Sequence, residues 1–255
     1  AGPVKLVSTT GSITVNAGTA ASAGVNAAST GNVLLETRAA DGDLIVNALV
    51  TSGSGHISLV ATDDVDLNAN VTTTGGSVYL SAANGTTAGG GELQGIDMAV
   101  GTSIATGGGN VVMTATGEAD IRLGLVNAGA GHVSLAAQRS ILDSGEAALN
   151  VQAATLRMVA DANSNAAGQI GQADGASAAG TNTNSIATQV TTLAATAADG
   201  IYVLESDGLT VDALATFDVS QVNFNSTTAT VTAAAREDLT TTDAGPIKLV
   251  STTGS

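Results

Sequence analysis

The chain has 255 residues and a formal net charge of −15, from 22 acidic and seven basic side chains. Such an acidic surface repels phosphate backbones and anionic bilayers, and no run of about 18 apolar residues is present, so we expect no nucleic-acid partner and no direct membrane insertion. The absence of cysteine excludes disulfides, and two Phe, two Tyr and no Trp against 32 Gly exclude a thick aromatic core.

The first pattern in the chain is the segment GPVKLVS, which starts at Gly2. Its form is glycine, any residue, apolar, any, apolar, any, small. The same form returns as GNVLLET from Gly31, GHISLVA from Gly55, GSVYLSA from Gly76, GNVVMTA from Gly109, GHVSLAA from Gly131 and GPIKLVS from Gly245. Alternating apolar positions predict strands with one buried face.

The apolar positions of these strands form the predicted core. They are Val4, Leu6, Val33, Leu35, Ile57, Leu59, Val78, Leu80, Val111, Met113, Val133 and Leu135. The residues between them point the other way, so Lys5, Ser58, Tyr79 and Ser134 are expected to face solvent.

A second apolar pair follows each of these strands, as at Leu44/Val46 and Val65/Leu67, and a third short patch such as Val71 precedes a Gly-rich corner. Three short strands in about 20–24 residues are typical of one solenoid coil, whereas a propeller blade needs about twice that length. The sequence therefore predicts an all-β fold, a right-handed parallel β-helix with three faces. At ~22 residues per coil, about eleven coils are expected in 243 residues.

Two stretches interrupt the rhythm and are predicted to be loops at corners, residues 84–102 and 161–185. Strand patterns resume at Gly200 with GIYVLES and continue with GLTVDA, VNFNS and ATVTAAA, which we expect to add further coils.

The last twelve residues repeat the first twelve, with only Val4 replaced by Ile247, at an offset of 243 residues between Ala1 and Ala244. This predicts one long tandem repeat in residues 1–243 and the start of the next in 244–255. Copies are then expected to associate end to end through their strand edges.

Recurrent polar residues suggest structural roles. Asn26, Asn47 and Asn68 follow apolar strand positions at a spacing of 21 residues and are predicted to form an amide ladder. His56 and His132 occupy equivalent positions, but three coils (~14 Å) separate them at β spacing, too far for one metal site.

Metal and catalytic signals are weak. Asp41 and Asp43 in the sequence DGD are the candidate calcium ligands, with solvated turn acids as the alternative. The scattered lysines and arginines do not form the acid, base and cation cluster that a polysaccharide-cleaving β-helix needs, so neither catalysis nor a cofactor is expected.

These coil patterns, together with DGIYVLESDGLTVDALAT at Asp199–Thr216, resemble the giant repetitive bacterial surface or secreted proteins with filamentous-haemagglutinin-like β-helical shafts. The resemblance implies export to the bacterial cell surface or medium, and a rod-like spacer in adhesion, matrix or cell–cell contact. The alternative is a module that binds surface glycans or a partner through loops 84–102 and 161–185.

Overall fold

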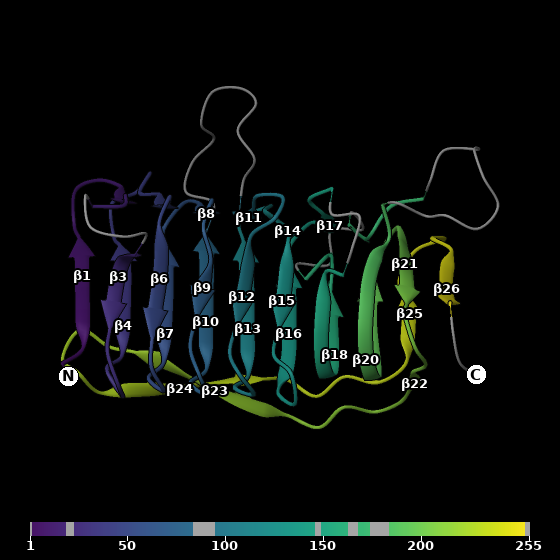
Figure 1. Cartoon of the computed structure of the whole chain (residues 1–255). Coiled ribbons are helices and arrows are strands. Elements are labelled where there is room, and N and C mark those ends of the chain that lie inside the picture. The colour runs from purple at the N-terminus through teal and green to yellow at the C-terminus, as the bar shows by residue number, and fades with distance from the viewer. Residues whose placement is uncertain are drawn as a thin grey trace.

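The computed structural model describes residues 2–18, 23–83, 95–145, 149–162, 168–173 and 184–252. In these ranges the protein is all-β: 24 strands wind into a parallel β-helix, and two more form a separate antiparallel hairpin (Figure 1). No helix in the described ranges is long and apolar enough to cross a membrane.

The first face of the solenoid carries the longest strands. Its rungs are β1 (Val4–Ser8), β4 (Val33–Thr37), β7 (Ile57–Ala61), β10 (Val78–Ala83), β13 (Val111–Thr116), β16 (His132–Ala137) and the second halves of β18 (Val151–Val159) and β20 (Ile186–Ala197). They stack in parallel and in register, so that Val4 lies opposite Val33, Val33 opposite Ile57 and Ile57 opposite Val78.

The other two faces use shorter strands. The second face holds β2 (Ile13–Val15), β5 (Leu44–Val46), β8 (Val65–Leu67), β11 (Gly95–Met98), β14 (Asp120–Leu123), β17 (Ile141–Asp143) and β19 (Gln169–Ile170). The third holds β3 (Ala23–Ala27), β6 (Leu49–Ser52), β9 (Val71–Thr72), β12 (Ser103–Ala105), β15 (Leu125–Asn127) and the first halves of β18 and β20. At the C-terminal end, β21 (Gly200–Glu205) and β26 (Ile247–Ser251) each run from the second face onto the third.

Two of these strands correct the loop assignments. β11 lies inside the segment 84–102 but pairs with β8 and β14, and β19 lies inside 161–185 but pairs with β17 and β21. Both are rungs of the second face, and their short apolar patterns were hidden by the glycine-rich sequence around them. Residues 84–94, 163–167 and 174–183 lie outside the described part of the chain.

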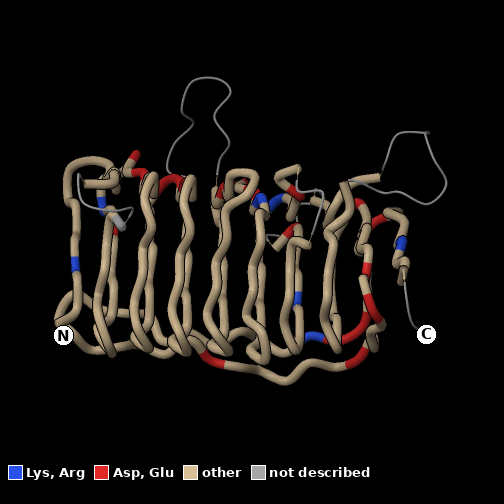
Figure 2. The backbone as a smooth tube through the Cα atoms, viewed as in Figure 1, with Lys and Arg blue, Asp and Glu red and all other residues tan. Residues whose placement is uncertain are grey.

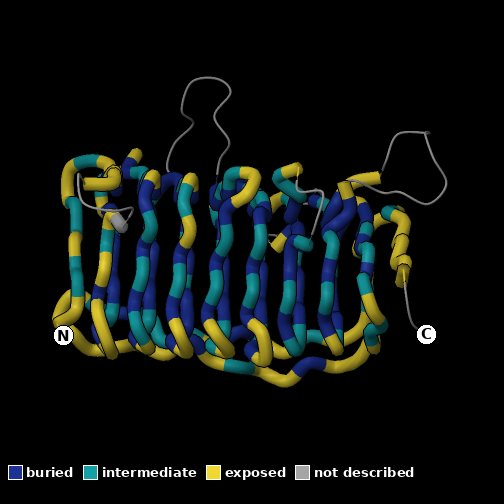
Figure 3. The backbone as a smooth tube through the Cα atoms, in the orientation of Figure 1, coloured by how far each residue is buried: buried dark blue, intermediate teal, exposed yellow. Residues whose placement is uncertain are grey.

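The apolar residues predicted for the core point inward and are buried from Val33 to Leu135, with exposures of 0 % (Figure 3). Val4 is half-buried and Leu6 is 49 % exposed, because β1 has a stacked neighbour on one side only. Burial therefore depends on stacking, as expected of a solenoid in which each coil completes the core of the next.

The glycine that begins each first-face strand is required by close packing at the corner. A Cβ added to Gly55 would lie 2.2 Å from the carbonyl oxygen of Gly31, and one added to Gly76 would lie 2.0 Å from that of Gly55. The same holds for Gly109 above Gly76. Any side chain would push successive coils apart, which explains why the repeated pattern starts with glycine.

The ninth first-face rung is split by an insertion. β22 (Thr210–Val211) pairs with Thr192 and Leu193 of β20, while β25 (Leu239–Thr241) pairs with Ala195 to Ala197 of the same strand. Residues 212–238 leave the rung between these halves and form the hairpin of β23 (Phe217–Val222) and β24 (Thr228–Ala233). We call residues 212–238 the strap, because Figure 1 shows them running back along the solenoid towards β1.

The strap also corrects two sequence predictions. VNFNS and ATVTAAA lie in the strap rather than in further coils, because an alternating pattern marks a strand without naming its partner. The described residues accordingly form nine first-face rungs, from β1 to the split rung β22/β25, rather than about eleven coils.

Candidate functional site

The strap lies on the outer surface of the first face and is anchored there by serines. The backbone amide of Ser220 donates to Ser77 Oγ at 2.9 Å, and that of Val222 donates to Ser58 Oγ at 2.8 Å. Ser58 is 0 % exposed and Ser134 is 8 % exposed. The expectation that these outward residues face solvent is therefore wrong, since the strap covers them.

Apolar contacts reinforce this anchoring. Val112 of β13 packs with Val219 and Ala233 of the strap, and all three are buried. Tyr79, Phe217 and Val231 pack against this small cluster. This cluster forms a second hydrophobic core outside the solenoid, on the outer surface that the alternating pattern predicted to face solvent.

Arg157 fixes the base of the strap. Its guanidinium donates to the carbonyls of Ala233 (3.0 Å), Ala234 and Ala215, and it lies 4.5 Å from the centre of the Phe217 ring. The side chain is 3 % exposed, and burial lowers its pKa, with a smaller contribution from the nearby positive charge of Arg236. The sequence pattern gave this arginine no specific role, because the basic residues are scattered along the chain. Its outward position on an otherwise uncharged rung was the signal that it has a partner.

The tip of the strap reaches β1. Lys5 Nζ donates to the backbone carbonyl of Phe224 at 2.8 Å and to Ser226 Oγ, and lies 5.7 Å from the centre of the Phe224 ring. The strap therefore leaves the solenoid at its last first-face rung and is held at its first.

Two open cavities flank the base of the strap. One, of about 530 Å³, is lined by Thr196, Leu214 and Arg236 among others, and the other, of about 330 Å³, by His132 and Arg157 among others. Arg236 Nη1 donates to Thr196 Oγ1 at 3.0 Å. These spaces arise where the paired segments 212–216 and 234–238 pass over the solenoid.

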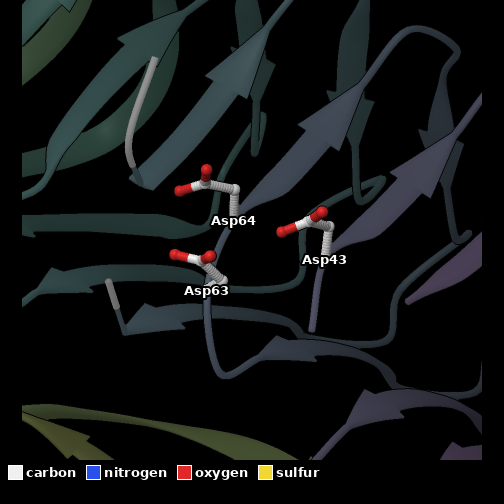
Figure 4. Close-up of side chains that lie close together, drawn as sticks. All are labelled: Asp43, Asp63 and Asp64. Atoms are coloured by element: carbon white, nitrogen blue, oxygen red, sulfur yellow. The ribbon is translucent and has the colours of Figure 1, made fainter. Parts of the chain in front are cut away.

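An acidic group lies at the corner that leads into the second face (Figure 4). Carboxylate oxygens of Asp43, Asp63 and Asp64 lie within 4.8 Å of one another. Register explains why: Asp43 and Asp64 directly precede Leu44 and Val65, which stack on each other. The calcium prediction paired Asp43 with Asp41, but Asp41 is exposed in the turn and does not belong to this group.

Burial raises the pKa of Asp64 to about 7, and the negative charges of Asp63, Asp66 and Asp43 add to the shift. The amide of Gly95 donates to Asp64 Oδ1 and opposes it. Calcium takes six to eight oxygen ligands, whereas a proton on Asp64 already relieves the repulsion among three carboxylates. Figure 2 shows acidic residues at the turns along this edge of the solenoid.

The amide ladder has a different membership from the one predicted. Asn47 Nδ2 donates to Asn16 Oδ1, and Asn68 Nδ2 donates to Asn47 Oδ1, both at 3.0 Å. Asn26 lies on the third face, opposite Thr51. The ladder residues follow Val15, Val46 and Leu67, which stack on the second face, so equal spacing along the chain pointed to the wrong asparagine.

The two histidines hold positions three rungs apart, on β16 and just before β7. His56 Nδ1 lies 2.9 Å from Ser77 Oγ, and His132 Nδ1 lies 2.9 Å from Thr155 Oγ1. His132 also packs against Phe217, with ring centres 5.3 Å apart. Each histidine is thus bonded to the next rung.

Both ends of the solenoid expose apolar strand surface. At the N-terminal end Leu6 is 49 % exposed, and at the C-terminal end Ile247 is 45 % and Leu249 37 % exposed. Among the described residues, β1 pairs only with β4 and β26 only with β21, so each has one backbone edge open to a further strand.

No family model matches the chain, and neither a curated protein nor a solved structure matches it.

Proposed function

We propose that this chain is a structural repeat of a long extracellular bacterial fibre or adhesin shaft, in which it acts as a rod-like spacer. The observation that carries the proposal is that nearly the same five-residue strand occupies both stacking ends: VKLVS forms β1 and IKLVS forms β26. β26 pairs with β21 on one side and differs from β1 only by Ile247 in place of Val4, so it is suited to start the next period.

Stacking supports a rod as the functional form. Each rung buries its apolar pair only where a neighbour lies on it, so stability grows by adding coils and length grows with the number of periods. The strap gives each period an outer brace along one face. The resemblance to filamentous-haemagglutinin-like shafts supports a location at the cell surface or in the medium, with other copies, glycans or neighbouring cells as contacts.

The experiment compares chains of one, two and three periods by small-angle X-ray scattering. One period spans eight coils and one further face from β1 to β26, so each added period should lengthen the rod by about 40 Å at ~4.8 Å per rung. The cross-section should stay constant. Maximum dimensions that fail to increase with each period would overturn the proposal.

Loop-mediated glycan binding is tested on the same protein. Deletion of residues 84–94, with Gly-Ser-Gly in their place, should leave the rod intact, since three residues also join the neighbouring strands β13 and β14. Loss of binding to a glycan array after this deletion would favour the binding module over the spacer.

A further inference from the structure

We propose that Lys248 is the docking point for the strap tip of the following period, and that successive straps therefore lie on different sides of the fibre. The inference rests on the proposed tandem array and names the residue on which the strap of each following period closes.

The contact already exists once in this chain. Lys5 on β1 is half-buried and holds Phe224 and Ser226 of the strap tip. Lys248 occupies the same position in the repeated strand β26, where it is exposed. In an array β26 serves as β1 of the next period, so Lys248 faces the next strap as Lys5 faces this one.

The tip is held in a turn by its own hydrogen bonds. The amide of Asn223 donates to the carbonyl of Thr227 at 2.9 Å, and Asn225 Oδ1 accepts from the amide of Thr227 at 3.1 Å. Ser226 has a φ of 75° and presents its hydroxyl to the lysine. Little conformational entropy is then lost when the tip meets an ammonium group.

The change of side between successive straps, which we call the side switch, follows from the register of β26. β1 heads the first face, but β26 stacks on β21, which runs from the second face to the third, and Lys248 lies opposite Tyr202. The first face of the next period therefore continues the second and third faces of this one. Its strap lies over Tyr202 rather than over the first face, where this period's own strap leaves the rung between β22 and β25.

The docking contact is tested with a two-period chain, residues 1–243 followed by 1–255, carrying Ser226→Asp in the second period only. Asp tolerates positive φ. In this chain position 248 is Lys5 of the second copy. Zero-length carbodiimide coupling should join the lysine at this junction to the aspartate, as it should join Lys5 to Ser226→Asp in the single-period chain. Thr230→Asp, in the middle of the strap, is the matched control and should give no adduct with Lys248.

The side switch is tested with cysteines, which the natural chain lacks. Phe224→Cys in the second period should be cross-linked by a short bismaleimide to Tyr202→Cys of the first, and not to Ala235→Cys at the base of the first strap. Linkage through Ala235→Cys, or no Lys248 adduct in a rod-shaped chain, would overturn the inference. Scattering separates the failures, because a compact two-period chain refutes the spacer itself.

Discussion

At the level of single residues, a side chain of this solenoid is defined by its column, the set of residues that stack on it in successive coils. Asn47 bonds to both neighbours in its column, and Asp64 meets Asp43 because their strands stack. Sequence spacing found Asn47 and Asn68 of the ladder and Asp43 of the acidic group. It chose Asn26 and Asp41 wrongly, because coil lengths vary and equal spacing does not keep a residue in its column.

Asn47→Ala should lower the free energy of unfolding by about 1–2 kcal/mol, because two amide hydrogen bonds are lost. Asn26→Ala is the matched control, since Asn26 is also exposed and lies outside the ladder. Urea denaturation of both variants measures the difference. Equal effects would mean that the ladder contributes nothing specific.

The raised pKa of Asp64 predicts a pH dependence of stability. The folded chain keeps a proton on Asp64 up to about pH 7, whereas the unfolded chain releases it near the ordinary pKa of 3.8. The free energy of unfolding should therefore fall as pH rises from about 4 to about 7. Burial raises the pKa of Asp97 and Glu205 as well, which gives the same sign.

Asp64→Asn should reduce the dependence of the free energy of unfolding on pH and should stabilise the protein at pH 7. The asparagine keeps a side-chain oxygen that can accept the hydrogen bond from the Gly95 amide. Asp41→Asn, outside the group of three carboxylates, should leave the slope unchanged. Denaturation at a series of pH values checks both, and an unaltered slope in Asp64→Asn would refute the explanation.

At the level of elements, the alternating pattern predicted the strands and their inward faces, but it could not predict the strap. Ser58 and Ser134 look solvent-exposed in sequence because a serine on the outer face is suited both to water and to a strap amide. The strap strands have the same alternation as the rungs, and only tertiary pairing shows that they are antiparallel.

Gly76→Ala should destabilise the protein by about 1–3 kcal/mol, because the new Cβ would lie 2.0 Å from the carbonyl oxygen of Gly55 and must force the coils apart. Gly11→Ala is the matched control, with nothing within 4 Å of its Cβ. Thermal unfolding of these two variants tests whether the stacked corner glycines are required for packing.

Arg157→Ala should lower the free energy needed to detach the strap by roughly 2–3 kcal/mol, since three backbone carbonyls lose a charged hydrogen-bond donor. Hydrogen exchange should accelerate at the amides of Phe217–Val222 while that of the inner rungs stays slow. Arg157→Lys should restore this protection only in part, because an ammonium group lacks the planar fork that reaches all three carbonyls. Arg139→Ala is the control and should have little effect, because Arg139 is exposed and lies 3.7 Å from Asp120.

At the level of the whole molecule, the exposed apolar ends predict association. Single-period chains should form end-to-end oligomers as concentration rises, because β1 and β26 each offer an open edge. Ile247→Lys should weaken this association by roughly tenfold, about 1.4 kcal/mol. Val100→Lys, at a 63 % exposed corner away from both ends, should not. Sedimentation velocity distinguishes the two, and equal behaviour would place the association elsewhere.

The clip between Lys5 and the strap joins residues 219 positions apart in the chain. A solenoid without such a clip can unzip from either end, one coil at a time. Here the first coil cannot unfold until the tip of the hairpin, which is inserted in the last first-face rung, dissociates from Lys5. When the fibre is pulled along its axis, each period should keep its length until the contact breaks and should then unfold in a single cooperative step.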